Sequence, residues 1–381
     1  MIDVNASDIH ICQIVGDNED PRIPPLRQIS YGIVIPTICC LGIIGNILNL
    51  VVLTRRNMRG TAYIYMRGYS AAALLAIIFF IPFALRVLIH KDTGQWNSWP
   101  PAFYHAHFEL FLGNACLGVG VMMLLALTIE RYVSVCRPGK YTRPLCGPPH
   151  LTVSLIPLAT FLVYLPSAFR GEITTCLVTP GGSLIYQKRD NLSFMHSVFY
   201  QIYKVVLEVV FKVAPTILLA AFNLRIMIVY RRSCERRRRM TLSRTVSGGD
   251  EDTRTFAEER RLVMLLGSTS ILFIVCVTPM VILNVTLADS NLVLYPYQVF
   301  RALANLLEVI NYSTTFYIYC LFSEDFRNTL IRTLQWPWGK SSSDSRRIPI
   351  KRSTIPRPTT TTTTPPPTTI ATPGHLARAS V

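Results

Sequence analysis

Long apolar segments recur through the first 321 residues of this chain, and they constrain its fold more than any other feature. Seven of them are long enough for an α-helix to cross the hydrocarbon core of a bilayer, which takes about 20 residues. They are expected at residues 30–54, 62–88, 103–136, 150–169, 198–230, 262–286 and 296–321. All seven should be helices, because backbone polar groups in lipid have to be hydrogen-bonded within their own segment. The predicted fold is an all-α membrane protein, a bundle of seven transmembrane helices.

The charge composition fits a membrane protein and disfavours a nucleic-acid partner. Charged residues make up 16% of the sequence, whereas soluble domains carry about 25%. The net charge of +16 comes from Lys and Arg that cluster in short connections between the apolar segments. A nucleic-acid-binding domain instead presents its basic residues on one soluble face. We therefore expect no nucleic-acid partner.

The same basic residues predict the orientation of the bundle, because cytoplasmic connections carry an excess of Lys and Arg. The basic connections are the first, third and fifth, with Arg55, Arg56 and Arg59, then Arg137, Lys140 and Arg143, then Arg231, Arg232 and Arg236 to Arg239. We expect a plasma-membrane protein with its amino terminus outside, where the glycosylation sequons at Asn5 and Asn191 also fall. The first 29 residues are polar and acidic, so the first apolar segment is expected to act as an uncleaved signal anchor.

Four regions follow from this pattern. Residues 1–29 form an extracellular amino-terminal segment, and residues 30–321 form the seven-helix domain. Residues 322–338 are predicted to form an amphipathic helix on the inner membrane surface, because their apolar residues recur at helical spacing and end in two Trp residues. Residues 339–381 are rich in Ser, Thr, Arg and Pro, and we expect a disordered cytoplasmic tail.

The triplet Glu130-Arg131-Tyr132 closes the third apolar segment, and further landmarks accompany it. They are Gly45-Asn46, Pro82-Phe83, Pro215, Cys276-Val277-Thr278-Pro279 and the run from Asn311 to Tyr319. With these motifs, about residues 30–335 resemble a rhodopsin-like (class A) G-protein-coupled receptor. Within that class the chain is most similar to invertebrate neuropeptide receptors of the FMRFamide type. That similarity rests on residues 109–114, Ala214-Pro215, Leu218, Asn223, Phe316 and Tyr317-Ile-Tyr319.

The resemblance implies a cytoplasmic switch that activates a heterotrimeric G protein. Arg131 pairs with Glu130 and Glu259 at rest and faces the G protein after the sixth helix swings outward, which makes a bistable element. Glu259 can equally belong to a solvated helix start. The implied switch residues are Glu130, Arg131, Tyr132, Asn223, Glu259 and Tyr319. A receptor kinase, an arrestin and membrane lipids are the partners implied for the basic fifth connection and the Thr-rich tail.

The chain departs from the class pattern at several positions. Ala73 replaces the usual Asp of the second segment, and Val277 replaces the usual Trp of the sixth. Ala106 stands where the class carries a Cys at the outer end of the third segment, so the usual partner of Cys176 is missing. We expect either that Cys176 pairs with Cys12 or that both thiols are free.

Three carboxylates within the spans indicate a ligand site, since intramembrane acids rarely face lipid. They are Glu109, Glu208 and Glu308, all in the predicted outer half. Lys204, Glu208 and Lys212 follow one another at intervals of four residues, so they can neutralise one another along one helix face. Glu109 and Glu308 have no such neighbour on their own helix.

Charged residues elsewhere in the outer half complete the predicted pocket. Arg86 and Arg301 are candidate partners of Glu109 and Glu308 across the bundle, and His107 is expected to line the cavity. A cavity among the second, third, fifth, sixth and seventh segments with such charges suits a short peptide that has a basic residue and a polar amide end.

Other functions stay open. A receptor for a lipid or small carboxylate would use Arg86, Lys204 or Lys212 in place of the acids. An orphan receptor that signals without ligand is the second alternative, because switch positions are altered. A transporter is the third, although transporters usually contain inverted repeats and the two halves of this chain show none. A monoamine ligand is disfavoured, because Gly113 stands where amine receptors carry an Asp. We expect no enzyme activity, cofactor or metal.

Overall fold

The structure is a computed structural model that describes residues 10–11, 20–58, 60–90, 95–137, 147–178, 183–243, 250–286 and 294–335. Within these ranges, the side chains of residues 10–11, 90, 177–178, 183, 237–243, 250–263, 266 and 285 are left out of the description. The predictions about Asn5, Cys12 and the tail after residue 335 therefore lie outside the described residues.

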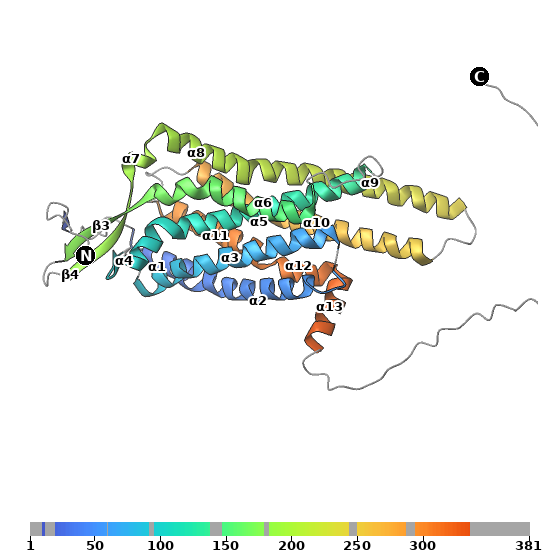
Figure 1. The fold of residues 1–381 in the computed structure, drawn as a ribbon, viewed down its shortest axis with the longest axis horizontal. Helices are drawn as coiled ribbons and strands as arrows, with labels where there is room; N and C mark the ends of the chain where they lie inside the picture. Colours follow the sequence, from blue (N-terminus) through green and yellow to red (C-terminus); the bar gives the residue numbers. More distant parts are fainter. Residues whose placement is uncertain are drawn as a thin grey trace, which may run out of the picture. The chain divides into compact units, whose positions relative to one another are not determined.

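Seven helical spans form the bundle (Figure 1). Span one is α1 (Ile23–Ile29), η2 (Ser30–Val34) and α2 (Ile35–Leu53), and span two is α3 (Thr61–His90). Span three is α4 (Trp99–Phe103), η3 (Tyr104–Phe108) and α5 (Glu109–Cys136), and span four is α6 (Pro149–Tyr164) with η4 (Leu165–Arg170). Span five is α8 (Val198–Glu208), η5 (Val209–Val213) and α9 (Ala214–Ser243), and span six is α10 (Asp250–Val285). Span seven is α11 (Tyr295–Ser313) and α12 (Thr315–Phe322).

The predicted seven-helix fold is confirmed, with differences at the span ends. Span one begins at Ile23 rather than residue 30, because Pro24 and Pro25 occupy the first helical turn, where proline is well accommodated. Among the described residues, spans one to six are long and apolar enough to cross a membrane. The seventh falls below that apolarity, since it is interrupted at Thr314 and carries two charged side chains.

A four-stranded sheet, which the sequence did not predict, lies at one end of the bundle (Figure 1). The hairpin of β3 (Gly171–Val178) and β4 (Ser183–Asp190) forms its centre, with β1 (His10–Ile11) parallel to β3 and β2 (Gln95–Trp96) antiparallel to β4. We call this the sheet end. The opposite end carries the short helix α13 (Glu324–Gln335), and we call it the α13 end.

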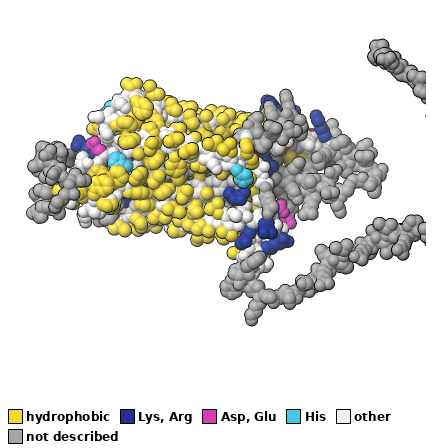
Figure 2. Space-filling model, in the orientation of Figure 1, with side chains coloured by type: hydrophobic (Ala, Val, Ile, Leu, Met, Phe, Trp, Pro, Cys, Tyr) yellow, Lys and Arg dark blue, Asp and Glu magenta, His cyan; other side chains and the backbone are white. Residues whose placement is uncertain are grey.

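The surface of the bundle is apolar around its middle, and most Lys and Arg side chains in view lie near the α13 end (Figure 2). Large apolar side chains such as Leu162, Val198 and Ile271 are more than half exposed. Soluble proteins rarely expose a contiguous apolar surface of this extent to water. Helices that cross a membrane present such a surface to the lipid.

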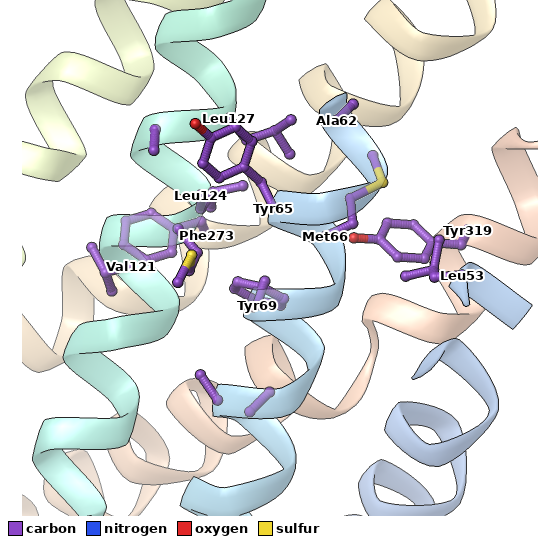
Figure 3. Packing of buried hydrophobic residues seen from close by; sticks show 14 of the residues in the cluster. Leu53, Ala62, Tyr65, Met66, Tyr69, Val121, Leu124, Leu127, Phe273 and Tyr319 are labelled. Carbon is purple, nitrogen blue, oxygen red and sulfur yellow. The ribbon is translucent and has the colours of Figure 1, made fainter. Parts of the chain in front are cut away.

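A cluster of buried apolar residues lies where spans two, three, six and seven meet (Figure 3). Tyr65, Met66 and Phe273 are almost completely buried there. Tyr69 of α3 stacks on Tyr312 of α11, with ring centroids 6.2 Å apart. Close van der Waals packing holds these spans together, because helices in lipid gain little from the hydrophobic effect.

The start of helix α13 is stabilised by a capping serine and by acidic residues in its first turn. The Ser323 hydroxyl accepts a hydrogen bond from the Phe326 amide (3.2 Å), and acidic residues occupy the first turn, next to the positive end of the helix dipole. The guanidinium of Arg327 donates to the carbonyls of Cys320 and Leu321 at the end of α12. Phe326 is 2% exposed and packs on Tyr319, so the helix is anchored to span seven.

Spans one and seven approach each other at Gly42. A Cβ at this position would overlap the Ser313 side chain and lie 2.8 Å from Cδ1 of Ile77. Nearby, the Asn46 amide donates to the carbonyls of Gly42 (2.9 Å) and Tyr312 (3.0 Å). The absence of a side chain therefore permits a polar tie between the two spans in the interior.

Gly42→Ala is expected to destabilise the folded protein by about 1–3 kcal/mol, the range for overpacking a filled core. The thermal unfolding midpoint of the detergent-purified protein measures this. Gly267→Ala is the matched control, since its Cβ would meet its nearest neighbour, Cε of Met227, at an ordinary 3.6 Å. Equal midpoints for Gly42→Ala and the wild type would show that the two spans are not closely packed.

Candidate functional site

A cavity of about 390 Å³ lies in the half of the bundle nearer the sheet. Its lining comes from spans one, two, three and seven. The aromatic wall is formed by Tyr31, Phe79, Phe80, Phe83 and Tyr312, and the charged side chains in the lining are Arg27, Glu109, Arg301 and Glu308. A mostly apolar cavity of this size with a few polar groups is typical of a ligand site.

This position differs from the predicted one. The sequence suggested a cavity among spans two, three, five, six and seven, whereas no described residue of span five or six lines the observed cavity. Glu208, Lys204 and Lys212 lie on span five, so the structure does not bring them into the site with Glu109 and Glu308. Periodicity places an acid on a helix but does not tell which neighbouring helix it faces.

Glu109 is held by Arg86. The Nη2 atom of Arg86 lies 3.1 Å from Oε1 of Glu109, and the two side chains are 6% and 15% exposed. The Arg86 guanidinium also lies over the Phe83 ring, 5.1 Å from its centroid. Because both charges are removed from water and paired, Glu109 contributes little net charge to the cavity.

Two further side chains support this pair. The Trp96 indole N–H donates to Nδ1 of His105 (3.3 Å), which leaves Nε2 of His105 as the protonated nitrogen. That Nε2 lies 3.9 Å from the Glu109 carboxylate. The carboxylate of Glu109 is thus approached from spans two and three, and Trp96 of β2 holds the His105 ring through its other nitrogen.

Lys188 is a charged neighbour that the sequence analysis missed. It lies on β4, where burial lowers the pKa of its ammonium; the Glu109 charge opposes this shift and the charges of Arg170 and Arg86 add to it. Nothing in the sequence marks this Lys as half-buried, since its position depends on the pairing of β3 with β4.

Glu308 differs from Glu109 because it has no ion pair with any described residue. It lines the inner part of the cavity, and the charged groups that act on it are Lys212 and Glu208. Arg301, the predicted partner, is exposed and lies seven positions away on the same helix, about 10 Å at 1.5 Å per residue. The predicted Arg301–Glu308 pair is therefore absent from the described structure.

The predicted neutralisation along span five occurs in part. Lys212 donates to Glu208 at 3.3 Å. The Asn284 amide of span six also donates to both carboxylate oxygens of Glu208, at 3.0 and 3.1 Å. Lys204 is exposed and forms no ion pair with a described residue. These contacts join spans five and six outside the cavity.

His107 does not line the cavity, in contrast to the expectation from its sequence position. Its Nδ1 lies 2.8 Å from the carbonyl oxygen of Ala168, and its ring packs on Phe103. The helix turns it toward η4 because residues two apart point in different directions.

Cys176 is disulfide-bonded, and the thiol of Cys116 is free. Strand β1 pairs His10 with Cys176, which brings the amino-terminal segment beside β3. Cys12 lies outside the described residues, so its pairing with Cys176 stays a prediction. Asn191, the described sequon, caps α7 (Leu192–Met195) through its side-chain oxygen, and its glycosylation also stays a prediction.

The predicted switch residues lie at the α13 end. Arg131 and Glu130 are half-buried at the end of α5, and the Tyr132 ring lies 5.0 Å from that of Phe222 on α9. The side chain of Glu259, within α10, is outside the description. Oε1 of Glu130 is buried without a hydrogen-bond partner.

Two other switch residues connect neighbouring spans. The Asn223 amide donates to the Ser270 hydroxyl at 2.7 Å and so links α9 to α10. Tyr319 is buried and borders a second cavity, of about 20 Å³, between spans two, three, six and seven. Their roles in signalling stay predictions.

Residues of span one were missed as well. Arg27 and Tyr31 line the cavity, and the Asn305 amide donates to the Tyr31 hydroxyl at 3.0 Å. The pair Pro24-Pro25 was the available signal, because prolines in the first turn mark a helix start ahead of residue 30.

Comparison with known proteins identifies the family. The family described as 7 transmembrane receptor (rhodopsin family) matches residues 45–312, and the chain belongs to it. A probable G-protein coupled receptor of Caenorhabditis elegans is 32% identical over 327 residues, which cover 84% of this chain and 73% of that protein. The FMRFamide receptor of Drosophila melanogaster is 25% identical over 79% of this chain and 53% of its own length. An FMRFamide peptide receptor of Caenorhabditis elegans is 27% identical over 78% and 67%.

Removing one partner of the Arg86–Glu109 pair should destabilise the protein by about 3–5 kcal/mol, because the other charge is left buried and alone. Arg86→Met is the test, measured by thermal unfolding in detergent. The double variant Arg86→Met/Glu109→Leu should lie close to the wild type, since an apolar pair of similar volume replaces the charges. Additive losses in the double variant would show that the two side chains stabilise the protein independently.

Proposed function

We propose that this chain is a plasma-membrane receptor that binds an extracellular peptide at the sheet end and activates a heterotrimeric G protein at the α13 end. The observation that carries the proposal is the carboxylate of Glu308, which lies without an ion-pair partner among the described residues in an aromatic-walled cavity. An unneutralised acid at that depth is expensive unless a ligand or water uses it.

The orientation rests on charge. Lys and Arg gather near the α13 end in Figure 2, and cytoplasmic ends of membrane proteins carry this excess. The sheet end would then face outward, together with the sequon at Asn191 and the bonded Cys176. Disulfides persist in oxidising compartments, which supports the same direction.

The ligand chemistry follows from the difference between the two acids. Glu109 is already paired with Arg86, so a cationic ligand group gains more at Glu308. Phe79, Phe80 and Phe83 offer an apolar wall for a neighbouring side chain. A short amidated peptide with one basic and one apolar side chain has both groups. Two of the relatives are named as receptors for FMRFamide peptides, which agrees with this ligand class.

The alternative ligand, a lipid or a small carboxylate, would require Arg86, Lys204 or Lys212 to be available in the cavity, and none of the three is. Arg86 is engaged by Glu109, and Lys212 by Glu208. Lys204 is exposed on span five, outside the cavity lining.

The inner partners belong to the same proposal. Arg131 would contact the G protein once span six moves away from span three, and Asn223 would exchange its bond to Ser270. A receptor kinase and an arrestin are proposed to act on the connection between spans five and six and on the tail. A screen of amidated peptides that contain a basic residue, with calcium and cAMP readouts, tests the function directly.

Arg131→Ala is expected to abolish G-protein activation while leaving ligand affinity within a few-fold, because Arg131 is at the α13 end and the cavity is near the sheet. Nucleotide exchange on purified G protein and peptide binding to membranes measure the two effects. Lys204→Ala, an exposed change on span five, is the control for surface expression. Full exchange activity by Arg131→Ala would remove Arg131 from the switch.

Glu308→Gln should weaken a peptide with a basic residue by about 2–5 kcal/mol, the range for removing one member of a buried charge pair. Glu109→Gln should have a smaller effect, since Arg86 already neutralises that acid. Competition binding measures both, with a norleucine analogue of the peptide as the uncharged reference. Equal losses for the basic and norleucine peptides would contradict a charge contact at Glu308.

A further inference from the structure

One face of α11 lines the cavity, and it carries an arginine nearer the start of the helix and a glutamate nearer its end. Gln298, Arg301, Asn305, Glu308 and Tyr312 all line the cavity from this helix. Arg301 is exposed at the mouth and forms no ion pair with a described residue, whereas Glu308 lies deeper. The seven positions between them correspond to about 10 Å along the helix.

A second arginine approaches the same mouth from span one. Arg27 lines the cavity from α1, and the charges of Arg27 and Arg301 both act on the hydroxyl of Tyr31. The two guanidinium groups therefore face one region of the mouth. Glu109, the second acid in the lining, is engaged by Arg86 and so offsets little of the charge of Arg301.

The cavity is thus positive at its mouth and negative at its inner end. We propose that it selects a bipolar ligand, a peptide whose basic side chain reaches Glu308 and whose acidic side chain, about 10 Å nearer the mouth, is held by Arg301 and Arg27. The inference rests on the proposed function, because it specifies the peptide class for the same cavity.

Both ends contribute to selectivity. An Arg–carboxylate contact at the mouth can be bidentate, which fixes the direction of the ligand as well as its position. A peptide inserted the other way would place its acid beside Glu308 and its base beside two arginines, and such like-charge contacts reject the wrong orientation. An extended chain rises about 3.3 Å per residue, so the acidic residue belongs two to four positions from the basic one.

The test uses a positional-scanning library of synthetic amidated hexapeptides with Arg fixed at one position and each other position filled in turn by Asp or Asn. Activation of cells that express the full chain is read by calcium and cAMP, and binding is read by stabilisation of the purified receptor. Asp at a distance of two to four positions should be more potent than Asn by about tenfold, which corresponds to ~1.4 kcal/mol. Asp at the adjacent position should give no such gain.

A charge swap identifies the contact. Arg301→Glu should reverse the preference, so that Lys at the selected position is more potent than Asp. Arg301→Gln should remove the preference, and it serves where the reversed charge prevents surface expression. Lys204→Glu changes the same charge on an exposed residue outside the cavity and should leave the Asp preference unchanged.

The outcomes separate the two proposals. Activation by peptides that shows equal potency for Asp and Asn at every position overturns the bipolar ligand and leaves the peptide receptor standing. A preference for Asp that survives both Arg301 variants also overturns it. Absence of both binding and activation across the library overturns the peptide receptor, and the bipolar ligand with it.

Discussion

The buried ion pair between Arg86 and Glu109 joins span two to span three, and it determines which charges of the site are left without a partner among the described residues. A charge in this setting has to be paired, hydrated or used by a ligand. Arg86 neutralises Glu109 at 3.1 Å, and Lys212 with Asn284 does the same for Glu208. Glu308 is the one of the three acids that forms no ion pair with a described residue. The three carboxylates therefore have three different environments, and the sequence distinguished only that of Glu208 from the other two.

The cavity and the α13 end are connected through one helix. Tyr312 lies at the inner end of the cavity lining, and its carbonyl accepts from Asn46 of span one. The helix is interrupted two residues later at Thr314, and α12 continues to Tyr319, which packs on Phe326 of α13. A displacement of span seven by a ligand at Glu308 would act on these contacts, which lie in sequence order along the same segment.

Hydropathy and motif spacing predicted the class of fold, because lipid leaves a chain with few options besides helices. They were less informative where long-range contacts decide. The hairpin β3–β4 and its pairing with β1 depend on partners far apart in sequence. The position predicted for the cavity also differed from the observed one. Glu208 is bonded to Asn284 of span six and does not join Glu308 in the cavity lining. Arg86 was recognised as a candidate partner because an acid within a span that has no neutralising neighbour on its own helix needs a cation from another span.

The composition of span seven also governs how the chain enters the membrane during synthesis. A charged residue at the centre of a helix opposes insertion by about 2.5–3.5 kcal/mol on the scale set by the insertion machinery. Span seven carries Arg301 and Glu308 and is interrupted at Thr314, and it falls below the apolarity of the six spans that precede it. Of the seven spans it leaves the ribosome last, and in the folded structure it is bonded to span one through Asn46 to the Tyr312 carbonyl and through Asn305 to the Tyr31 hydroxyl. Stable insertion of the last helix is therefore expected to depend on these contacts with span one.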